Sequence, residues 1–195
     1  MSNQYIQRVL TRQFLGTSSL GDLLSSQLDA TAYNNPGSKI FVQDVSGNMT
    51  SFVYVYTAGL TAVVAGVPMY WYDQTRCNAT DTVTSAVTYA ASSDSAIQSA
   101  AGVAISIPTT TTPYCWLSCG GYMTGLPTPT SCTVGDLLLL SNSASVAPSN
   151  DAWFRVAKGT AAATAEAVTT LYACVTSVIS TASVAALILG TVGMP

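Results

Sequence analysis

Histidine is absent from this sequence of 195 residues, and charged residues are scarce. Only 8% of the residues are Asp, Glu, Lys or Arg, against roughly 25% in an average soluble domain. Without histidine the chain lacks the usual general base at neutral pH and the imidazole ligand of mixed zinc sites. A Ser-His-Asp or Cys-His catalytic arrangement within this chain is therefore excluded.

The other residue types that support catalysis are present, but their spacing does not fit a catalytic site. The single glutamate, Glu166, lies in an alanine-rich stretch, and no aspartate lies within three positions of another acidic residue. Neither Lys39 nor Lys158 belongs to an S-x-x-K motif, and Gly120-Gly121 forms no phosphate-binding loop. Asp136 follows a glycine, which is typical of a residue that caps a turn. We predict a protein without catalytic residues, cofactor or metal, and not an enzyme.

Positive charge is too sparse for a nucleic-acid partner. No lysine or arginine occurs between Arg76 and Arg155, whereas duplex binding needs clustered basic side chains that displace counterions.

Two stretches of the sequence decide whether a membrane is an expected partner. Residues 1–15 hold no apolar core of a secretory signal. The apolar tail from Val175 to Met194 contains six Ser and Thr residues, which favours a buried pair of strands over a membrane helix. We expect neither nucleic acid nor membrane as a partner.

The five cysteines form an odd set without a C-x-x-C motif. We predict buried, reduced thiols that act as small hydrophobic residues, which fits a reducing compartment. If residues 115–119 form a strand, Cys115 and Cys119 face the same side as Leu117. A metal site that combines both thiols with Cys132 is the alternative to packing.

Short β-branched and aromatic segments, separated by turn residues, follow one another from residue 39 onward. The clearest example is a predicted hairpin over residues 39–58, centred on Ser46-Gly47-Asn48. No long segment has helical periodicity. We therefore predict a mainly β fold, an antiparallel barrel or sandwich over residues 39–195.

Aromatic residues at strand spacing are typical of a core or a subunit interface, and a sugar-binding platform is the alternative. These residues are Trp71, Trp116, Tyr54, Tyr56, Tyr70, Tyr72 and Tyr114.

Two parts of the chain, offset by about seventy residues, look alike. Residues 64–72 and 133–140 each place a turn glycine before a strand. Residues 99–106 and 171–177 supply a second strand further along. The β fold is thus predicted to consist of two related halves.

This pattern predicts an N-terminal arm, residues 1–38, followed by a β domain with possible halves 39–107 and 114–190. The threonine-rich run from Pro108 to Pro113 is predicted to be an extended linker. The arm has too little apolar surface to fold alone, so we expect it to order on a neighbouring subunit, the alternative being that it folds back on its own domain. Its candidate contact residues are Tyr5, Ile6, Val9, Leu10, Phe14 and Leu15.

Residues 60–190 resemble the head decoration, or cement, proteins of tailed bacteriophages. In those proteins a small-residue segment opens a strand, a strand of the G-V-A type and an aromatic strand follow, and the unit is repeated. Here residues 64–67 and 134–137 resemble the openers. Residues 101–105 resemble the central strand, and residues 113–118 the aromatic strand.

The resemblance implies a β-barrel-like domain that forms homotrimers on the outer surface of the capsid and cements neighbouring subunits of the major capsid protein. The protein would be assembled in the host cytoplasm and reside in the virion. Val67, where an acidic residue is common, and Cys174, where glycine is common, depart from the family pattern. Other virion proteins, such as a fibre or spike, and a carbohydrate-binding β-sandwich are the alternatives.

Overall fold

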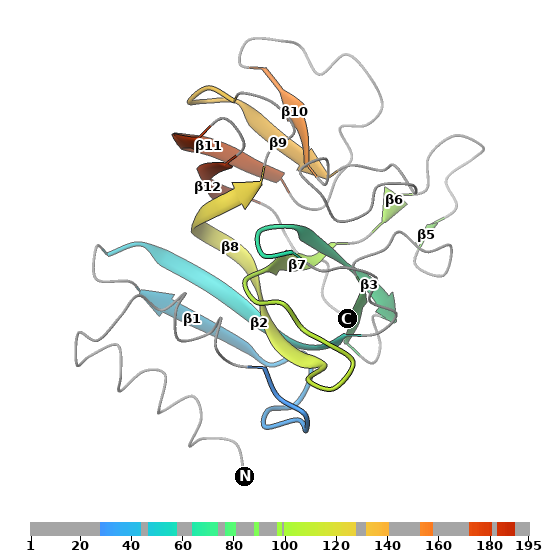
Figure 1. The fold of residues 1–195 in the computed structure, drawn as a ribbon. Coiled ribbons are helices and arrows are strands. Elements are labelled where there is room, and N and C mark those ends of the chain that lie inside the picture. The colour runs from blue at the N-terminus through green and yellow to red at the C-terminus, as the bar shows by residue number, and fades with distance from the viewer. Residues whose placement is uncertain are drawn as a thin grey trace.

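The computed structural model describes the following residues (Figure 1): 28–43, 47–57, 64–73, 77–80, 88–89, 97–98, 100–127, 132–140, 153–157, 172–180 and 183–189. Within these ranges the chain forms strands and turns but no helix, so the prediction of a mainly β fold is confirmed. The strands are β1 (Lys39–Gln43), β2 (Met49–Thr57), β3 (Pro68–Asp73), β4 (Asn78–Thr80), β5 (Thr88–Tyr89), β6 (Ile97–Gln98), β7 (Ala100–Ala104), β8 (Tyr114–Pro127), β9 (Leu137–Leu140), β10 (Trp153–Val156), β11 (Tyr172–Ser180) and β12 (Ser183–Leu189).

Ten of these strands form one large mixed sheet, in the order β1-β2-β4-β3-β7-β8-β12-β11-β9-β10. The only parallel pair recorded in it is β2 with β4, while β5 and β6 form a separate two-stranded sheet. β2 also pairs with β8, so that β2, β4, β3, β7 and β8 are linked in a closed circuit of strand pairs. The long strand β8 therefore contacts both parts of the sheet (Figure 1).

Two local predictions from the sequence are confirmed. β1 and β2 form the predicted antiparallel hairpin, in a register that runs from Lys39 opposite Val53 to Gln43 opposite Met49. In the apolar tail, β11 and β12 form the predicted antiparallel pair of strands. The pair is not buried throughout as expected, because residues 176–180 and Leu187 are exposed. None of the described segments is a helix of the length and hydropathy needed to cross a membrane.

The threonine-rich run between β7 and β8 was expected to be extended, and this prediction is wrong. The amide of Thr109 donates to the carbonyl of Thr112 at 3.4 Å, and the amide of Thr112 donates back to the carbonyl of Thr109 at 3.2 Å. The hydroxyls of the same two residues lie 2.8 Å apart. Threonine side chains compete for hydrogen bonds with nearby backbone groups, and here they stabilise a compact loop between two antiparallel neighbours of the circuit.

The turns before β3 and β9 have the same hydrogen-bond geometry. The amide of Gly66 donates to the carbonyl of Ala104 at 2.7 Å, and the amide of Gly135 donates to the carbonyl of Val175 at 2.8 Å. Each glycine has a positive φ, +87° and +93° respectively, a conformation that glycine adopts without a steric penalty. Each turn sets the register between its strand and the strand beside it.

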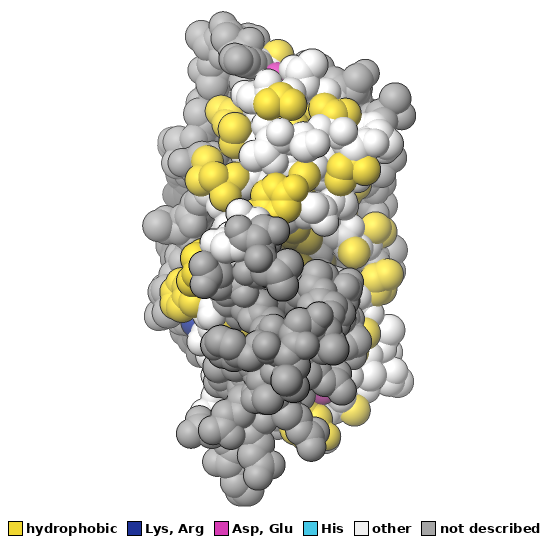
Figure 2. Space-filling view, turned by 90° about the vertical axis from the view of Figure 1, so that its left-hand side faces the viewer, with side chains coloured by type: hydrophobic (Ala, Val, Ile, Leu, Met, Phe, Trp, Pro, Cys, Tyr) yellow, Lys and Arg dark blue, Asp and Glu magenta, His cyan; other side chains and the backbone are white. Residues whose placement is uncertain are grey.

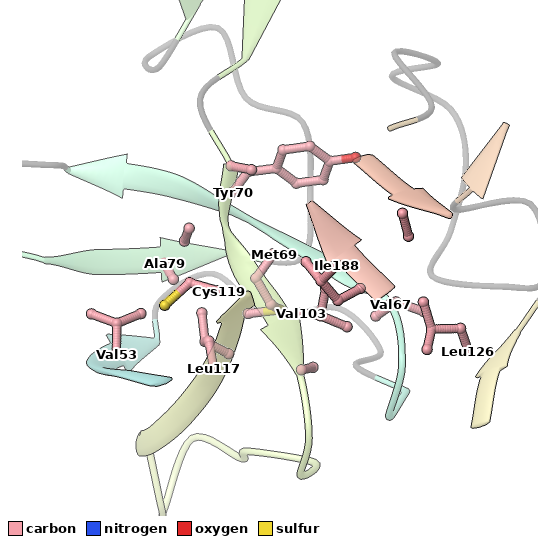
Figure 3. Packing of buried hydrophobic residues seen from close by; sticks show 14 of the residues in the cluster. Val53, Val67, Met69, Tyr70, Ala79, Val103, Leu117, Cys119, Leu126 and Ile188 are labelled. Carbon is pink, nitrogen blue, oxygen red and sulfur yellow. The ribbon is translucent and has the colours of Figure 1, made fainter. Parts of the chain in front are cut away.

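The main hydrophobic core lies between the strands of the circuit and β12. Figure 3 shows Met69, Val103 and Leu117 close together, with Ile188 of β12 beside them. A smaller cluster, composed of Ile40, Phe52, Tyr54 and Trp116, packs on the other face of β2 and β8. Both faces of these two strands are therefore buried, which explains why their apolar residues form nearly continuous runs.

Candidate interaction surface

The arm residues proposed for partner binding, from Tyr5 to Leu15, lie outside the described residues. The last part of the predicted arm, residues 28–38, is described and contacts the protein's own sheet. Asp29 and Tyr114 exchange backbone hydrogen bonds of 3.0 and 3.2 Å, and the amide of Gly37 donates to the carbonyl of Tyr54 at 2.7 Å. This part of the chain is thus anchored to β2 and β8.

A buried hydrogen bond reinforces this anchor. The hydroxyl of Tyr54 donates to Oδ2 of Asp29 at 2.7 Å, and the amide of Tyr33 lies 3.4 Å from the same hydroxyl oxygen. Burial raises the pKa of the Asp29 carboxyl, and the bond from Tyr54 opposes part of that rise. The hydrogen bond thus gives this carboxyl a structural role, since it links residues 28–38 to β2.

The aromatic residues named as an alternative sugar-binding platform lie mainly in the core. Trp71, Trp116, Tyr54 and Tyr70 are each at most 5% exposed, and burial raises the pKa of Tyr70 to about 12. Tyr54 packs on Trp116 with ring centroids 5.0 Å apart. The interpretation of these four residues as core is confirmed, and a platform built from them is not accessible to a sugar.

The five cysteines all lie within the described residues, and no disulfide joins them. Cys115, Cys119 and Leu117 belong to one core cluster, as their predicted common side requires. Burial raises the pKa of the Cys115 thiol to about 12 and raises that of Cys119 as well, which keeps both as inert thiols. No group of three metal-binding side chains occurs in the part of the chain that is described. Cys174 differs from the other four because it is partly exposed.

Asp136 caps a turn, as its position after Gly135 predicts. Its carboxylate accepts hydrogen bonds from the amide of Thr133 at 2.8 Å and from the hydroxyl of the same residue at 3.0 Å. The side chain is fully buried. A carboxylate that is held in this way organises the turn before β9.

Charge is nearly absent from the described surface. Only Asp29, Lys39 and Asp136 carry charge among the residues whose side chains are described, and the two carboxylates are buried. The same surface exposes large apolar side chains: Tyr33, Phe41, Met49, Val64, Ile107, Val134, Leu137, Val178, Ile179 and Leu187. Figure 2 shows hydrophobic groups scattered among other side chains and backbone atoms over the upper part of one side of the molecule.

Four residues form an apolar row across the strands β9, β11, β12 and β8. Leu137 pairs with Cys174, Cys174 with Leu187, and Leu187 with Tyr122. Paired residues of neighbouring strands point to the same face. Leu137 is 36% exposed and Leu187 is 38% exposed, while Cys174 and Tyr122 are partly buried. We call these four residues the exposed row.

Sequence reasoning did not find the exposed row. Leu137 stands in a run of four leucines and Leu187 in the apolar tail, and such runs are typical of strands that are buried on both faces. The sequence does not indicate which of these residues remain exposed to solvent, because their exposure depends on what covers the second face of the sheet.

Comparisons with models of protein families, with characterised proteins and with solved structures give no match to this chain. The chemistry of its surface and core is therefore the basis for a functional proposal. That surface offers apolar side chains with almost no charge, an arrangement that suits contact with another protein better than binding of a charged ligand.

Proposed function

We propose that this chain is a structural subunit of a virus particle, which binds the outer surface of the capsid and cements neighbouring subunits of the major capsid protein. The observation that carries the proposal is the nearly uncharged described surface with its exposed apolar side chains. Leaving such groups in water is unfavourable, and permanent protein–protein interfaces bury groups of this kind. The resemblance to phage decoration proteins in residues 60–190 supports the same function.

The energetic basis of attachment would be apolar burial. Phe41 is 67% exposed, and Met49 is 54% exposed on the neighbouring strand. Burying a side chain of this size stabilises a complex by roughly 1.5–3 kcal/mol when it is fully exposed beforehand. A few such contacts in each copy, repeated over many copies, would hold a capsid lattice together without any charged pair. Attachment of this kind should depend little on salt, unlike binding through charged side chains.

The proposal includes a finer description of the fold, two related β units of the barrel type with an N-terminal arm. Support comes from the closed circuit of β2, β4, β3, β7 and β8 and from the equivalent turns at Gly66 and Gly135. In the second part of the sheet, β8, β12, β11, β9 and β10 are neighbours in the corresponding order. A homotrimer is the proposed assembly, with the arm from residue 1 as a contact element.

Co-sedimentation tests attachment. Particles of the virus whose genome encodes the chain would be prepared without it, mixed with the purified protein and centrifuged. We expect saturable binding that is nearly constant between low and high salt. Absence of the protein from native particles by mass spectrometry, together with no binding to the bare ones, would overturn the proposal. Bovine serum albumin at the same concentration serves as the control for trapped protein.

A further inference from the structure

The exposed row has a counterpart in the first part of the sheet. There Pro68 pairs with Val103, Val103 with Ser118, and Ser118 with Phe52. This row crosses β3, β7, β8 and β2 in the same order in which the exposed row crosses β9, β11, β12 and the end of β8. We call these four residues the covered row. The strand β8 ends the first unit and begins the second.

The two rows differ in burial. Val103 is 0% exposed, Ser118 1% and Phe52 4%, and Pro68 is buried. At the corresponding positions the second unit carries two leucines that are more than one third exposed. At two of the four positions the exposed row carries a leucine, Leu137 in place of Pro68 and Leu187 in place of Ser118. A partner that covers the row would remove the apolar surface of both leucines from water, which is favourable.

The chain itself lies over the part of this face that β2 and β8 form, whereas Val103 packs in the main core. Phe52 and Ser118 share a face with Tyr54 and Trp116, because residues two apart in a strand point the same way. Over that face lies the segment 28–38, bound through the hydrogen bond from Tyr54 to Asp29. The second unit has no segment of this kind ahead of it, since its first strand is the continuation of β8.

We propose that the exposed row is covered by the apolar N-terminal stretch, residues 5–15, of a second copy of this chain. That stretch lies ahead of the segment 28–38 in the sequence, separated from it by residues 16–27, and it supplies large apolar side chains that can cover the row. Figure 1 places the anchored segment that begins at Leu28 at the opposite end of the molecule from β9, β11 and β12. A neighbouring copy can present its stretch to this face without having to cross its own domain. The inference does not rest on the proposed virion function.

The size of the face favours exchange of segments over flat stacking of two sheets. Four strands at about 4.8 Å spacing and about seven residues of roughly 3.3 Å give a face of roughly 440 Å². A stable interface buries about 800 Å² on each partner. Two stacked faces fall short of this area. When each copy both donates a stretch and receives one, the buried area per copy is about doubled and reaches the required range.

Sedimentation velocity of the full chain over a range of concentrations tests the inference. We expect the wild type to self-associate, and Leu137→Ser with Leu187→Ser to weaken the association constant by about tenfold or more. Leu10→Ser with Phe14→Ser should have a similar effect. Ile107→Ser is the matched control, because Ile107 is 54% exposed on a loop away from the row. Unchanged urea midpoints would show that all variants remain folded.

Mixing the two double variants makes the test decisive. One retains an intact stretch and the other an intact row, so a mixed pair can form one of the two contacts and should associate more strongly than either variant alone but more weakly than the wild type. Cys174 provides a second readout, because its alkylation should slow as the wild-type concentration rises. A monomeric wild type, or a mixture that associates no more strongly than either variant alone, would overturn the inference. Protection of Cys174 that is independent of concentration would also overturn it, since the row would then be covered within one chain.

Discussion

Gly66 and Gly135 close turns of the same geometry in two parts of one sheet. Each donates its amide to a strand that follows much later in the chain, Gly66 to Ala104 and Gly135 to Val175. The return bonds also correspond, from the amide of Ala104 to Val67 and from that of Val175 to Asp136, at 2.9 Å in both cases. The position of Gly66 has a further requirement. A Cβ there would lie 2.6 Å from Cδ of Pro127 and 2.7 Å from the carbonyl oxygen of Gly125.

Replacing Gly66 by alanine should therefore destabilise the protein strongly. An alanine in this left-handed backbone conformation lowers the free energy of unfolding by about 1–2 kcal/mol. Its Cβ also overlaps backbone atoms of β8, which lowers the free energy of unfolding by about 1–3 kcal/mol more. Gly125→Ala is the matched control, since Gly125 also has a positive φ, +78°, but open space around its Cβ position. Urea denaturation should show the larger loss for Gly66→Ala, and equal losses would contradict the packing of this turn on β8.

The stability contributed by Asp29 should decrease as the pH rises. Burial raises the pKa of this carboxyl above its ordinary value of 3.8, so the folded state favours the protonated form. Its favourable contribution is complete below the unfolded pKa and is lost as the pH passes through the folded pKa. Asp29→Asn keeps an acceptor for Tyr54 but does not titrate. Between about pH 3 and pH 7, the wild type should lose stability relative to this variant, and a constant or opposite difference would refute the assignment.

Trp116→Ala should cost about 3–5 kcal/mol of unfolding free energy. Trp116 is fully buried and packs on Tyr54 with centroids 5.0 Å apart, so its removal leaves a cavity in the smaller cluster that it forms with Ile40, Phe52 and Tyr54. Phe41→Ala is the comparison, because Phe41 is 67% exposed, and it should change stability by no more than about 0.5 kcal/mol. Thermal and urea unfolding would both measure the loss of stability in each variant. Similar losses for the two variants would contradict this account.

Alkylation of the native protein at low concentration should modify Cys174 first. Cys174 is partly exposed, whereas the other four cysteines are buried and burial raises the pKa of the Cys115 thiol to about 12. Peptide mass spectrometry after brief iodoacetamide treatment would give the order of modification. Early labelling of Cys115 would be inconsistent with its position in the core. Labelling in urea provides the fully reactive control.

The local elements were largely predictable from the sequence because their signals are local. The hairpin of β1 and β2 follows from β-branched segments around a turn, and the strand pair in the tail follows from its Ser and Thr content. The cap formed by Asp136 follows from its place beside Gly135. The threonine run near Thr109 was misjudged because mutual hydrogen bonds of threonine side chains outweighed the extended preference of β-branched residues.

The sheet order and the exposed row could not be derived in this way. The two units that we infer share β8, so their division falls within a strand rather than at the Pro108–Pro113 run. Whether Leu137 and Leu187 are buried depends on which segment covers their face, and this relation joins residues far apart in the chain. Periodicity reports which residues share a face but does not report what covers it.

Heating of virus particles tests the proposed structural role most directly. Particles of the virus whose genome encodes the chain would be made with and without it, and the temperature of genome release would be followed with a dye that binds DNA. The account predicts release at a clearly higher temperature when the chain is bound, and restoration of that temperature when purified chain is added to bare particles. Identical release temperatures at saturating, verified binding would contradict a cementing role.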